Sequence, residues 1–302
     1  MATGSVVVVG SVALDTIEGT GGRATSILGG SATFASVAAS YFAPTKLLAC
    51  IGEDFPAADL KVFEERGIDV SGLARLPGKT FRWTGIYAHG FRGRETLSLD
   101  LGVFLQFAPV LGGPLPKGSI LLLGNIDPDL QLTVLDQAGP DAFVAADTID
   151  HWIKSKRGTL LKGLARTHLF FLNDQEAELL TGETNLVVAG AAIRKMGPRL
   201  VVIKKGEHGA LLFGDEGLSI VPALPLERVV DPTGAGDVFA GAMLGSLARD
   251  GARDLASMRL AMARGTVMSS FAVEDFSVRR LRGLTPADIE ERLARLRSLV
   301  KF

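Results

Sequence analysis

The sequence predicts an α/β protein whose central sheet is mainly parallel and is covered by helices on both faces. Short runs of apolar, often β-branched residues recur along the 302 residues and alternate with longer segments of helical periodicity. Such alternation requires right-handed crossovers, which place helices on both faces of a parallel sheet. Hydrophobic residues make up 47% of the chain and charged residues 22%, which is sufficient for a sizeable core. We therefore expect a single domain over residues 1–302.

The expected elements follow one another from the N-terminus. The run Val6–Val9 predicts a first strand, and the Ala- and Ser-rich segment Ser31–Phe42 predicts a helix of small residues. A second strand at Lys46–Ile51 precedes an amphipathic helix at Phe55–Arg66. The later elements are strands at Ile120–Leu123, Ala142–Ala146, His168–Leu172 and Leu200–Ile203, each followed by a helical segment, and a C-terminal helix at Pro286–Leu299 with Thr285 as its N-cap.

One segment departs from this pattern. Thr80–His89 and Arg94–Leu101 alternate polar and apolar residues around a Gly-containing turn, which predicts a half-buried antiparallel hairpin. We expect a small β-sheet lid, formed mainly by residues 80–105 with a contribution from residues 14–28. Closing over a ligand and forming a homodimer are both roles open to this insertion.

Composition excludes several classes of function. The formal net charge of -1 provides no field that would attract nucleic acid or an anionic membrane. No apolar run approaches the length of a membrane span, and the N-terminus lacks a basic signal region, so a cytoplasmic protein is expected. The single cysteine, Cys50, lies in an apolar run and is expected as a buried strand residue rather than a nucleophile.

Two glycine-containing segments imitate nucleotide-binding loops. Five residues separate Gly72 from Gly78, whereas a P-loop requires four. The segment Gly19–Ala24 resembles a dinucleotide fingerprint but does not directly follow a strand, so a solvent-side turn is expected. The four histidines show no metal-ligand spacing.

The segment from Asp231 to Ala242 has the strongest chemical signal. Gly234 and Gly236 permit unusual backbone conformations and leave room for an anion, and a helix of small residues follows them. A glycine turn at a helix N-terminus presents free amides and the positive end of the helix dipole to a phosphate. Asp237 would then be a carboxylate beside a phosphate site, suited to accept a proton from an attacking hydroxyl. The alternative is that Asp237 is only a helix N-terminal carboxylate after a tight turn.

This segment resembles the second signature of the ribokinase (PfkB) family of carbohydrate kinases. Further matches occur in the family's order over nearly the whole chain. Gly29 and Gly30 resemble its N-terminal diglycine, Asp15 its substrate-binding aspartate, Ile51–Asp54 its Gly-x-Asp turn, Asn173–Glu176 its Asn-x-x-Glu motif and Lys205–Ala210 its nucleotide loop. The resemblance implies a ribokinase-like three-layer α/β/α sandwich with a small inserted β-sheet lid.

The resemblance also implies ATP-dependent phosphoryl transfer. Asp237 would be the general base, and the amides of Gly234, Ala235 and Gly236 would form the anion hole for the transferred group. Asn173 and Glu176 would organise the triphosphate and, through water, Mg²⁺.

Substrate and nucleotide would contact further positions. Asp15, Gly29 and Gly30 would hold substrate hydroxyls. The adenine nucleotide would contact Lys205, Gly206, Gly209, Met262, Gly265 and Thr266. Asp231 and Thr233 are expected to contribute to a K⁺ site.

Each of these smaller matches also has a purely structural explanation when taken alone. Asn173–Glu176 fits a helix capping pair, Gly29-Gly30 a loop before a helix, and Asp15 a turn residue. The joint order of the matches favours the kinase interpretation.

The acceptor is expected to be a hydroxyl of a small sugar or polyol. Phe34 occupies a position where many family members have an Asn, so specificity for ribose or adenosine is not implied. A nucleoside kinase is the alternative, since Trp83, Phe104 and Phe107 are able to stack on a base or to belong to the core. A non-catalytic ligand-binding protein is a more distant alternative. Trp83, Arg92 and Arg94 are candidates to close over the substrate, although an exposed arginine is commonly only solvated.

Overall fold

The computed structural model describes residues 4–87 and 93–301, and it contains a nine-stranded central sheet. The strand order is β13-β12-β11-β10-β9-β8-β1-β4-β5. In this order, every neighbouring pair from β11 through to β5 is parallel. At the other edge, β12 pairs antiparallel with β11, and β13 pairs antiparallel with β12. The strands are β1 (Val6–Val9), β4 (Thr45–Gly52), β5 (Asp69–Leu76), β8 (Ile120–Leu123), β9 (Phe143–Ala146), β10 (Leu169–Asn173), β11 (Leu200–Lys204), β12 (Ala210–Gly214) and β13 (Gly217–Val221).

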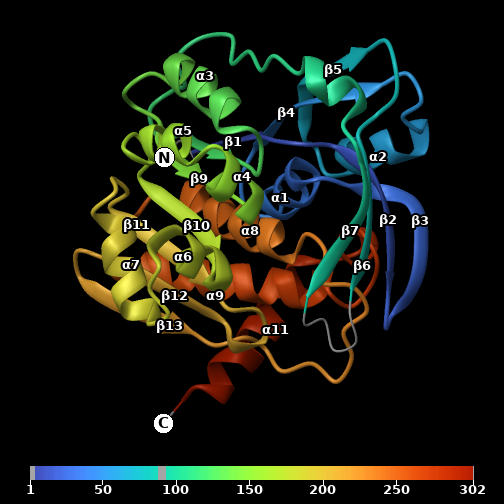
Figure 1. The fold of residues 1–302 in the computed structure, drawn as a ribbon. Helices are drawn as coiled ribbons and strands as arrows, with labels where there is room; N and C mark the ends of the chain where they lie inside the picture. Colours follow the sequence, from blue (N-terminus) through green and yellow to red (C-terminus); the bar gives the residue numbers. More distant parts are fainter. Residues whose placement is uncertain (1–3, 88–92, 302) are drawn as a thin grey trace.

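Helices cover both faces of this sheet, so the predicted three-layer arrangement is confirmed (Figure 1). Side chains of a strand alternate between the two faces. In β1, Val6 and Val8 join one hydrophobic core, and Val7 and Val9 join the other. The first core includes α1 (Ser31–Ala39), α2 (Ala57–Glu65), α8 (Ala235–Asp250), α9 (Leu255–Ala272), α10 (Arg279–Arg282) and α11 (Pro286–Leu299). The second includes α3 (Pro128–Ala138), α4 (Asp150–Ser155), α5 (Arg157–Leu164), α6 (Asp174–Thr181) and α7 (Leu186–Arg194).

Small residues allow α1 and α8 to pack very closely. Every residue of α1 is buried, and the helix ends at Ala39, three residues before the predicted end. A Cβ atom at Gly241 of α8 would collide with the carbonyl of Ala35, and a Cβ at Gly245 would press on the backbone of Ala39. A side chain at either position would therefore force the two helices apart. At the start of α8, Gly234 touches the ring of Phe34 in α1. Contacts therefore advance in the same direction along both helices, which makes them parallel and places their N-termini at the same end.

A second, four-stranded sheet has the order β3-β2-β6-β7. Its strands are β2 (Ala13–Gly19), β3 (Gly22–Gly29), β6 (Arg82–Tyr87) and β7 (Arg94–Asp100). The β6–β7 pairing is antiparallel, which confirms the predicted hairpin, although the residues of its turn lie outside the described ranges. The β2–β3 pairing is also antiparallel, and β2 joins β6 in parallel. Figure 1 shows this sheet projecting from the edge of the main body.

The two imitation loops have no nucleotide-binding geometry. Gly72 lies inside β5, a strand that the sequence analysis missed because half of its residues are exposed and none is fully buried. Gly19 and Gly22 flank the turn between β2 and β3, as expected. Cys50 is fully buried in β4, where burial raises the pKa of its thiol to about 12, so the nucleophile alternative is excluded.

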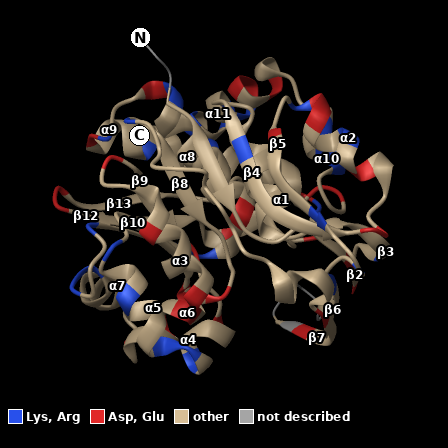
Figure 2. Ribbon diagram, turned by 90° about the horizontal axis from the view of Figure 1, so that it is seen from above, with Lys and Arg blue, Asp and Glu red and all other residues tan. Residues whose placement is uncertain are grey.

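The charged residues do not gather on one surface. Figure 2 shows acidic and basic residues interspersed over helices and strands. Within the part of the chain that the structure describes, no helix combines the length and apolar character needed to cross a membrane.

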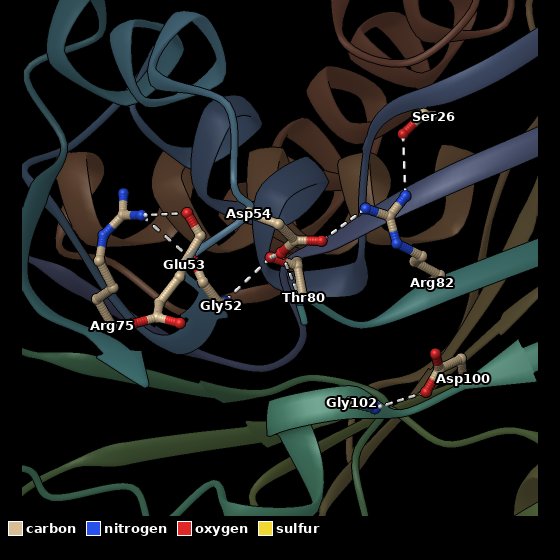
Figure 3. Close-up of polar contacts among 9 residues, drawn as sticks. All are labelled: Ser26, Gly52, Glu53, Asp54, Arg75, Thr80, Arg82, Asp100 and Gly102. Carbon is tan, nitrogen blue, oxygen red and sulfur yellow. Dashed lines mark hydrogen bonds and ion pairs between the residues drawn. The ribbon is translucent and has the colours of Figure 1, made fainter. Parts of the chain in front are cut away.

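The turn after β4 anchors the small sheet to the main sheet (Figure 3). The Asp54 carboxylate accepts hydrogen bonds from the amide and hydroxyl of Thr80, both at 2.7 Å, and forms an ion pair with Arg82 at 2.7 Å. The Thr80 hydroxyl also accepts a hydrogen bond from the amide of Gly52 at 3.0 Å. Arg82 reaches across to the hydroxyl of Ser26 in β3 at 3.1 Å, so one carboxylate ties β4 to both hairpins of the small sheet.

We predict that Asp54→Asn destabilises the protein in a pH-dependent way. Partial burial disfavours the charged carboxylate, but hydrogen bonds from Thr80 and Arg82 outweigh it and lower the pKa of Asp54 from 3.8 to about 2. The folded-state pKa lies below the unfolded one, so the stabilisation is present above pH 4 and is lost as the pH falls towards 2. Measured by urea unfolding at pH 7, the free energy of unfolding of Asp54→Asn should be about 1–2 kcal/mol lower than that of the wild type. At pH 3 this difference should be smaller.

The neighbouring Glu53→Gln provides the control. Its side chain is exposed, and only its backbone carbonyl accepts a hydrogen bond from Arg75. It should change stability by less than about 0.5 kcal/mol at either pH. An Asp54→Asn effect that does not depend on pH would show that packing, not the charge, is responsible.

Candidate active site

The turn before α8 has the geometry of an anion-binding helix terminus. Gly234 is the N-cap, with a left-handed φ of 75°, and a Cβ there would also collide with the Phe34 ring. Glycine is therefore required twice at this position, by conformation and by space. The Ala235 amide donates to the Pro232 carbonyl at 3.2 Å, and the Val238 amide closes the first turn on the carbonyl of Gly234 at 2.8 Å. The amides between them point out of the helix end, where the dipole favours an anion.

Asp237 is the third residue of α8 and is half-buried beside these amides. The carboxylate therefore lies at the helix terminus that would carry the phosphoryl group. Both alternatives for Asp237 require this position, so the position alone does not choose between a base and a helix-terminal carboxylate.

A group of charges at the carboxyl ends of β9, β10 and β11 faces this terminus. Asp147 directly follows β9, and the last residues of β10 and β11, Asn173 and Lys204, are register partners. The Lys204 ammonium lies 2.7 Å from Asp147 Oδ2. It would also be 3.0 Å from a Cβ atom on Gly236, so it adjoins the first turn of α8. Sequence analysis missed both Lys204 and Asp147, although each is a charged residue at the end of an apolar strand.

Asn173 and Glu176 form a reciprocal cap on α6. The Asn173 side chain accepts from the Glu176 amide, and the Glu176 side chain accepts from the Asn173 amide, both at 2.7 Å. The capping explanation is therefore correct for these two residues, and it does not exclude a second role. Burial raises the pKa of Glu176 to about 7 even though Lys204 opposes the shift.

A cavity of about 690 Å³ adjoins the start of α8 and has the size expected for a nucleotide-like ligand. It brings together Gly236 and Ala235 with four of the residues predicted to contact the nucleotide: Lys205, Gly206, Gly209 and Thr266. Gly209 has a φ of 88°, and a Cβ there would collide with the carbonyl of Val221. The other two predicted residues do not line this cavity. Met262 is completely buried in the core, and Gly265 packs against Phe239.

The residues predicted to bind the substrate also meet. Asp15 is buried in β2, not in a turn, and its carboxylate lies directly against the backbone of Gly29. Gly30, with a φ of 94°, is the N-cap of α1, and a Cβ there would collide with the Ser11 carbonyl. Because α1 and α8 are parallel, their N-termini are at the same end, and the substrate and phosphate candidates lie beside each other.

The inner face of the small sheet adds aromatic groups to this region. Trp83 of β6 is the register partner of Asp15, and its indole donates to the Thr96 hydroxyl at 3.1 Å. Tyr87 of the same strand accepts a hydrogen bond from the Thr233 hydroxyl at 3.0 Å. Arg92 and the side chain of Arg94 lie outside the described part of the chain.

The two remaining aromatic candidates belong to the core. Phe107 is buried in the hydrophobic core on the α3 side of the main sheet, and Phe104 packs against it with ring centroids 5.3 Å apart. Phe104 also stacks on Phe81 at 5.7 Å. The core alternative is therefore correct for Phe104 and Phe107, and Trp83 is the aromatic candidate that shares a sheet face with Asp15.

Asp231 is an unusual buried carboxylate in the same turn. Asp231 is only 2% exposed, and its Oδ1 atom accepts a hydrogen bond from the Thr233 amide at 2.9 Å. Within the described ranges, Asp231 Oδ2 has no hydrogen-bond partner. Burial raises the pKa of Asp231, although Thr233 and the Ser277 backbone partly stabilise its charge. An unpartnered buried oxygen of this kind is suited to a cation.

Comparison with known proteins agrees with this arrangement. A model of the pfkB family of carbohydrate kinases matches residues 3–281. The chain is 34% identical over 255 residues to the cytidine kinase of Thermococcus kodakarensis, covering 81% of this chain and 88% of that protein.

Solved structures share the fold across different acceptors. The nucleoside kinase of Burkholderia thailandensis in complex with inosine superposes with a TM-score of 0.77 at 20% identity, covering 98% of this chain and 97% of that one. The fructokinase of Vibrio cholerae with fructose, ADP and calcium bound gives a TM-score of 0.77 at 19% identity, covering 96% and 99%. The fold alone therefore does not choose between a nucleoside and a sugar.

Proposed function

Because this chain belongs to the pfkB family of carbohydrate kinases, which are phosphotransferases with an alcohol acceptor, we propose that it uses ATP to phosphorylate a hydroxyl group of a nucleoside. The observation that carries the choice of acceptor is the 34% identity to a cytidine kinase over 81% of this chain. Trp83, beside Asp15 on the inner face of the small sheet, supports it by offering an aromatic surface for a base. A free sugar or polyol is the competing acceptor, since Asp15 and Gly29 would hold ribose and sugar hydroxyls equally well.

The geometry of the site supports a direct transfer. Asp237 accepts the proton of the acceptor hydroxyl as its oxygen bonds to the γ-phosphorus, and the bond from that phosphorus to the β,γ-bridging oxygen breaks, which releases ADP. The outward amides at the start of α8, around Gly236, stabilise the negative charge of the transferred group. Asp15, Gly29 and Gly30 orient the acceptor, and Lys205, Gly206, Gly209 and Thr266 line the space for the nucleotide.

Mg²⁺ is part of the proposal through Glu176 and Asn173. Among the described residues, no group of three or more His, Cys, Asp or Glu side chains is placed to hold a metal. One carboxylate and one amide side chain fit an ion that keeps several waters, so Glu176 and Asn173 would hold Mg²⁺ through water, with the nucleotide phosphates as its other partners. When bound, Mg²⁺ supplies charge neutralisation for the polyphosphate.

We predict that Asp237→Asn lowers kcat by about 10²–10⁴-fold while leaving ATP affinity nearly unchanged, because only the proton acceptor is lost. ADP release should be measured with Mg·ATP against cytidine, uridine, adenosine, inosine, ribose and fructose. Asp237-dependent turnover on the nucleosides is the expected result. Turnover confined to ribose or fructose would replace the nucleoside by a sugar and retain the mechanism.

Asp288→Asn is a matched control for this experiment. Asp288 is the third residue of α11, as Asp237 is of α8, and it completes a capping box with Thr285. If Asp237 were merely a helix-terminal carboxylate, the two variants would behave alike, each losing about 1 kcal/mol of stability and little activity.

We further propose that Asp231 and Thr233 contribute to a K⁺ site beside the anion-binding turn. The supporting observation is that the Oδ2 atom of Asp231 has no hydrogen-bond partner among the residues that the structure describes. Turnover and melting temperature should rise with KCl at constant ionic strength, balanced by choline chloride, and Asp231→Asn should abolish the response. Burial raises the pKa of Asp231, so protons compete with K⁺ and the response should weaken as the pH falls. An unchanged KCl response in Asp231→Asn would refute the site.

We also propose that the small sheet forms a homodimer. Its edge strand β7 exposes Leu97 and Leu99, which are 53% and 56% accessible, and an exposed apolar edge strand favours pairing with another chain. Light scattering should give twice the monomer mass, and Leu97→Lys with Leu99→Lys should give the monomer. Ile220→Lys, on the edge strand of the central sheet, is the control and should leave the mass unchanged. A monomeric wild-type protein would refute the proposal.

A further inference from the structure

Lys204 is a deeply placed cation whose position matches no role assigned so far. It ends β11, and because Val202 two residues earlier belongs to the core on the α8 side, the Lys204 side chain points towards α8. Its side chain is 17% exposed and that of its partner Asp147 is 6% exposed. The ammonium lies 6.0 Å from the centroid of the buried Phe171 ring of β10.

The ammonium adjoins the anion-binding terminus. A Cβ on Gly236 would be 3.0 Å from Lys204 Nζ and 3.6 Å from its Cδ and Cε. Gly236 is the second residue of α8, and both residues line the same cavity. An anion seated on the first-turn amides is therefore beside the ammonium. The absence of a side chain at Gly236 leaves this approach open.

The carboxylates around Lys204 are not explained by a contribution to stability alone. Burial opposes the charged form of Lys204, but neighbouring carboxylates outweigh it and raise the pKa of the ammonium; these are Asp147, Glu176 and Asp237. A polyphosphate entering among such carboxylates is repelled unless cations offset them. A buried ion pair adds little net stability, because desolvation offsets the attraction between its partners. A fixed ammonium beside helix-terminal amides is, in contrast, an effective partner for a phosphoryl group.

Resting on the kinase function proposed above, we propose that Lys204 is a catalytic residue that contacts the phosphoryl oxygens at the start of α8, and that Asp147 is the positioning residue that aims it. Lys204 stays protonated throughout and donates hydrogen bonds to an oxygen of the transferred group and to the β,γ-bridging oxygen, whose charge increases as its bond to phosphorus breaks. The bridging oxygen becomes part of the β-phosphate of ADP, so the contact is made with ADP as well as with ATP, and not with AMP. Bond making and breaking are those described above, with the acceptor proton going to Asp237. Asp147 holds the ammonium beside Gly236 when no phosphate is bound.

Nucleotide binding tests the contact without relying on turnover. Affinities for AMP, ADP and ATP are measured by calorimetry for the wild type and for Lys204→Met. The variant should bind ADP and ATP about tenfold more weakly, by the usual strength of a charged hydrogen bond, and AMP with unchanged affinity. Lys46→Met is the control, because Lys46 forms its ion pair with Asp69 at the opposite end of β4. Equal ADP affinity in Lys204→Met and the wild type would overturn the proposal.

Kinetics separate catalysis from a structural ion pair. Lys204→Met should lower kcat about 10²-fold or more, the usual effect of removing one transition-state donor, and Lys204→Arg should recover part of it. Asp147→Asn should lower kcat more than it raises KM for ATP, since the cation remains but is poorly aimed.

The double variant Lys204→Met/Asp147→Asn removes both buried charges and so keeps the protein folded even if the single lysine variant does not. It should remain as inactive as Lys204→Met. Wild-type turnover in the double variant would show that the pair is only structural and overturn the assignment. A wild-type protein that discriminates ADP from AMP through Lys204 but phosphorylates no acceptor would refute the proposed function alone. A wild type that binds no nucleotide would refute both.

Discussion

The close, parallel packing of α1 on α8 is the constraint on which the site depends. Gly241 and Gly245 bring the backbone of α8 against the carbonyls of α1, and the ring of Phe34 packs on Gly234 at the N-terminus of α8. Two helices held in this way aim both N-termini at the same place, and their dipoles both favour negative charge there. Larger side chains at the glycines would separate the helices and move the anion-binding turn away from the diglycine of α1.

The sheet supplies the second half of the site through its carboxyl edge. Parallel strands end at the same edge, so the residues that follow β9, β10 and β11 converge although they are distant in sequence. Asp147, Asn173 and Lys204 lie close together at this edge. The N-terminus of α8, which packs on one face of the sheet, places Gly236 against Lys204. The edge therefore brings together the amides at the start of α8, the ammonium of Lys204 and the carboxylate of Asp147.

The small sheet brings the acceptor side to this edge. Its attachment is polar, through the Asp54 carboxylate and its contacts with Thr80 and Arg82 (Figure 3). Its inner face carries Asp15 and Trp83 as register neighbours, and Tyr87 touches Thr233 of the anion-binding turn. The residues proposed to hold the acceptor thus lie largely on a sheet separate from the one that ends at Lys204.

The sequence by itself determined the alternation of buried strands and helices, the hairpin at Thr80–Leu101, and the glycine turn before Asp237. These features arise from local periodicity and from the conformations that only glycine adopts readily. The sequence analysis also expected residues 14–28 to join this small sheet, and β2 pairs there with β6. It missed the strand β5, because an exposed strand has no strong local pattern. Only the tertiary structure decided that Phe104 and Phe107 are core residues, that Met262 is buried in the core and does not line the cavity, and that Lys204 of the central sheet meets Gly236 of α8. Those outcomes depend on side chains from distant segments competing for the same space, which no single segment of the chain encodes.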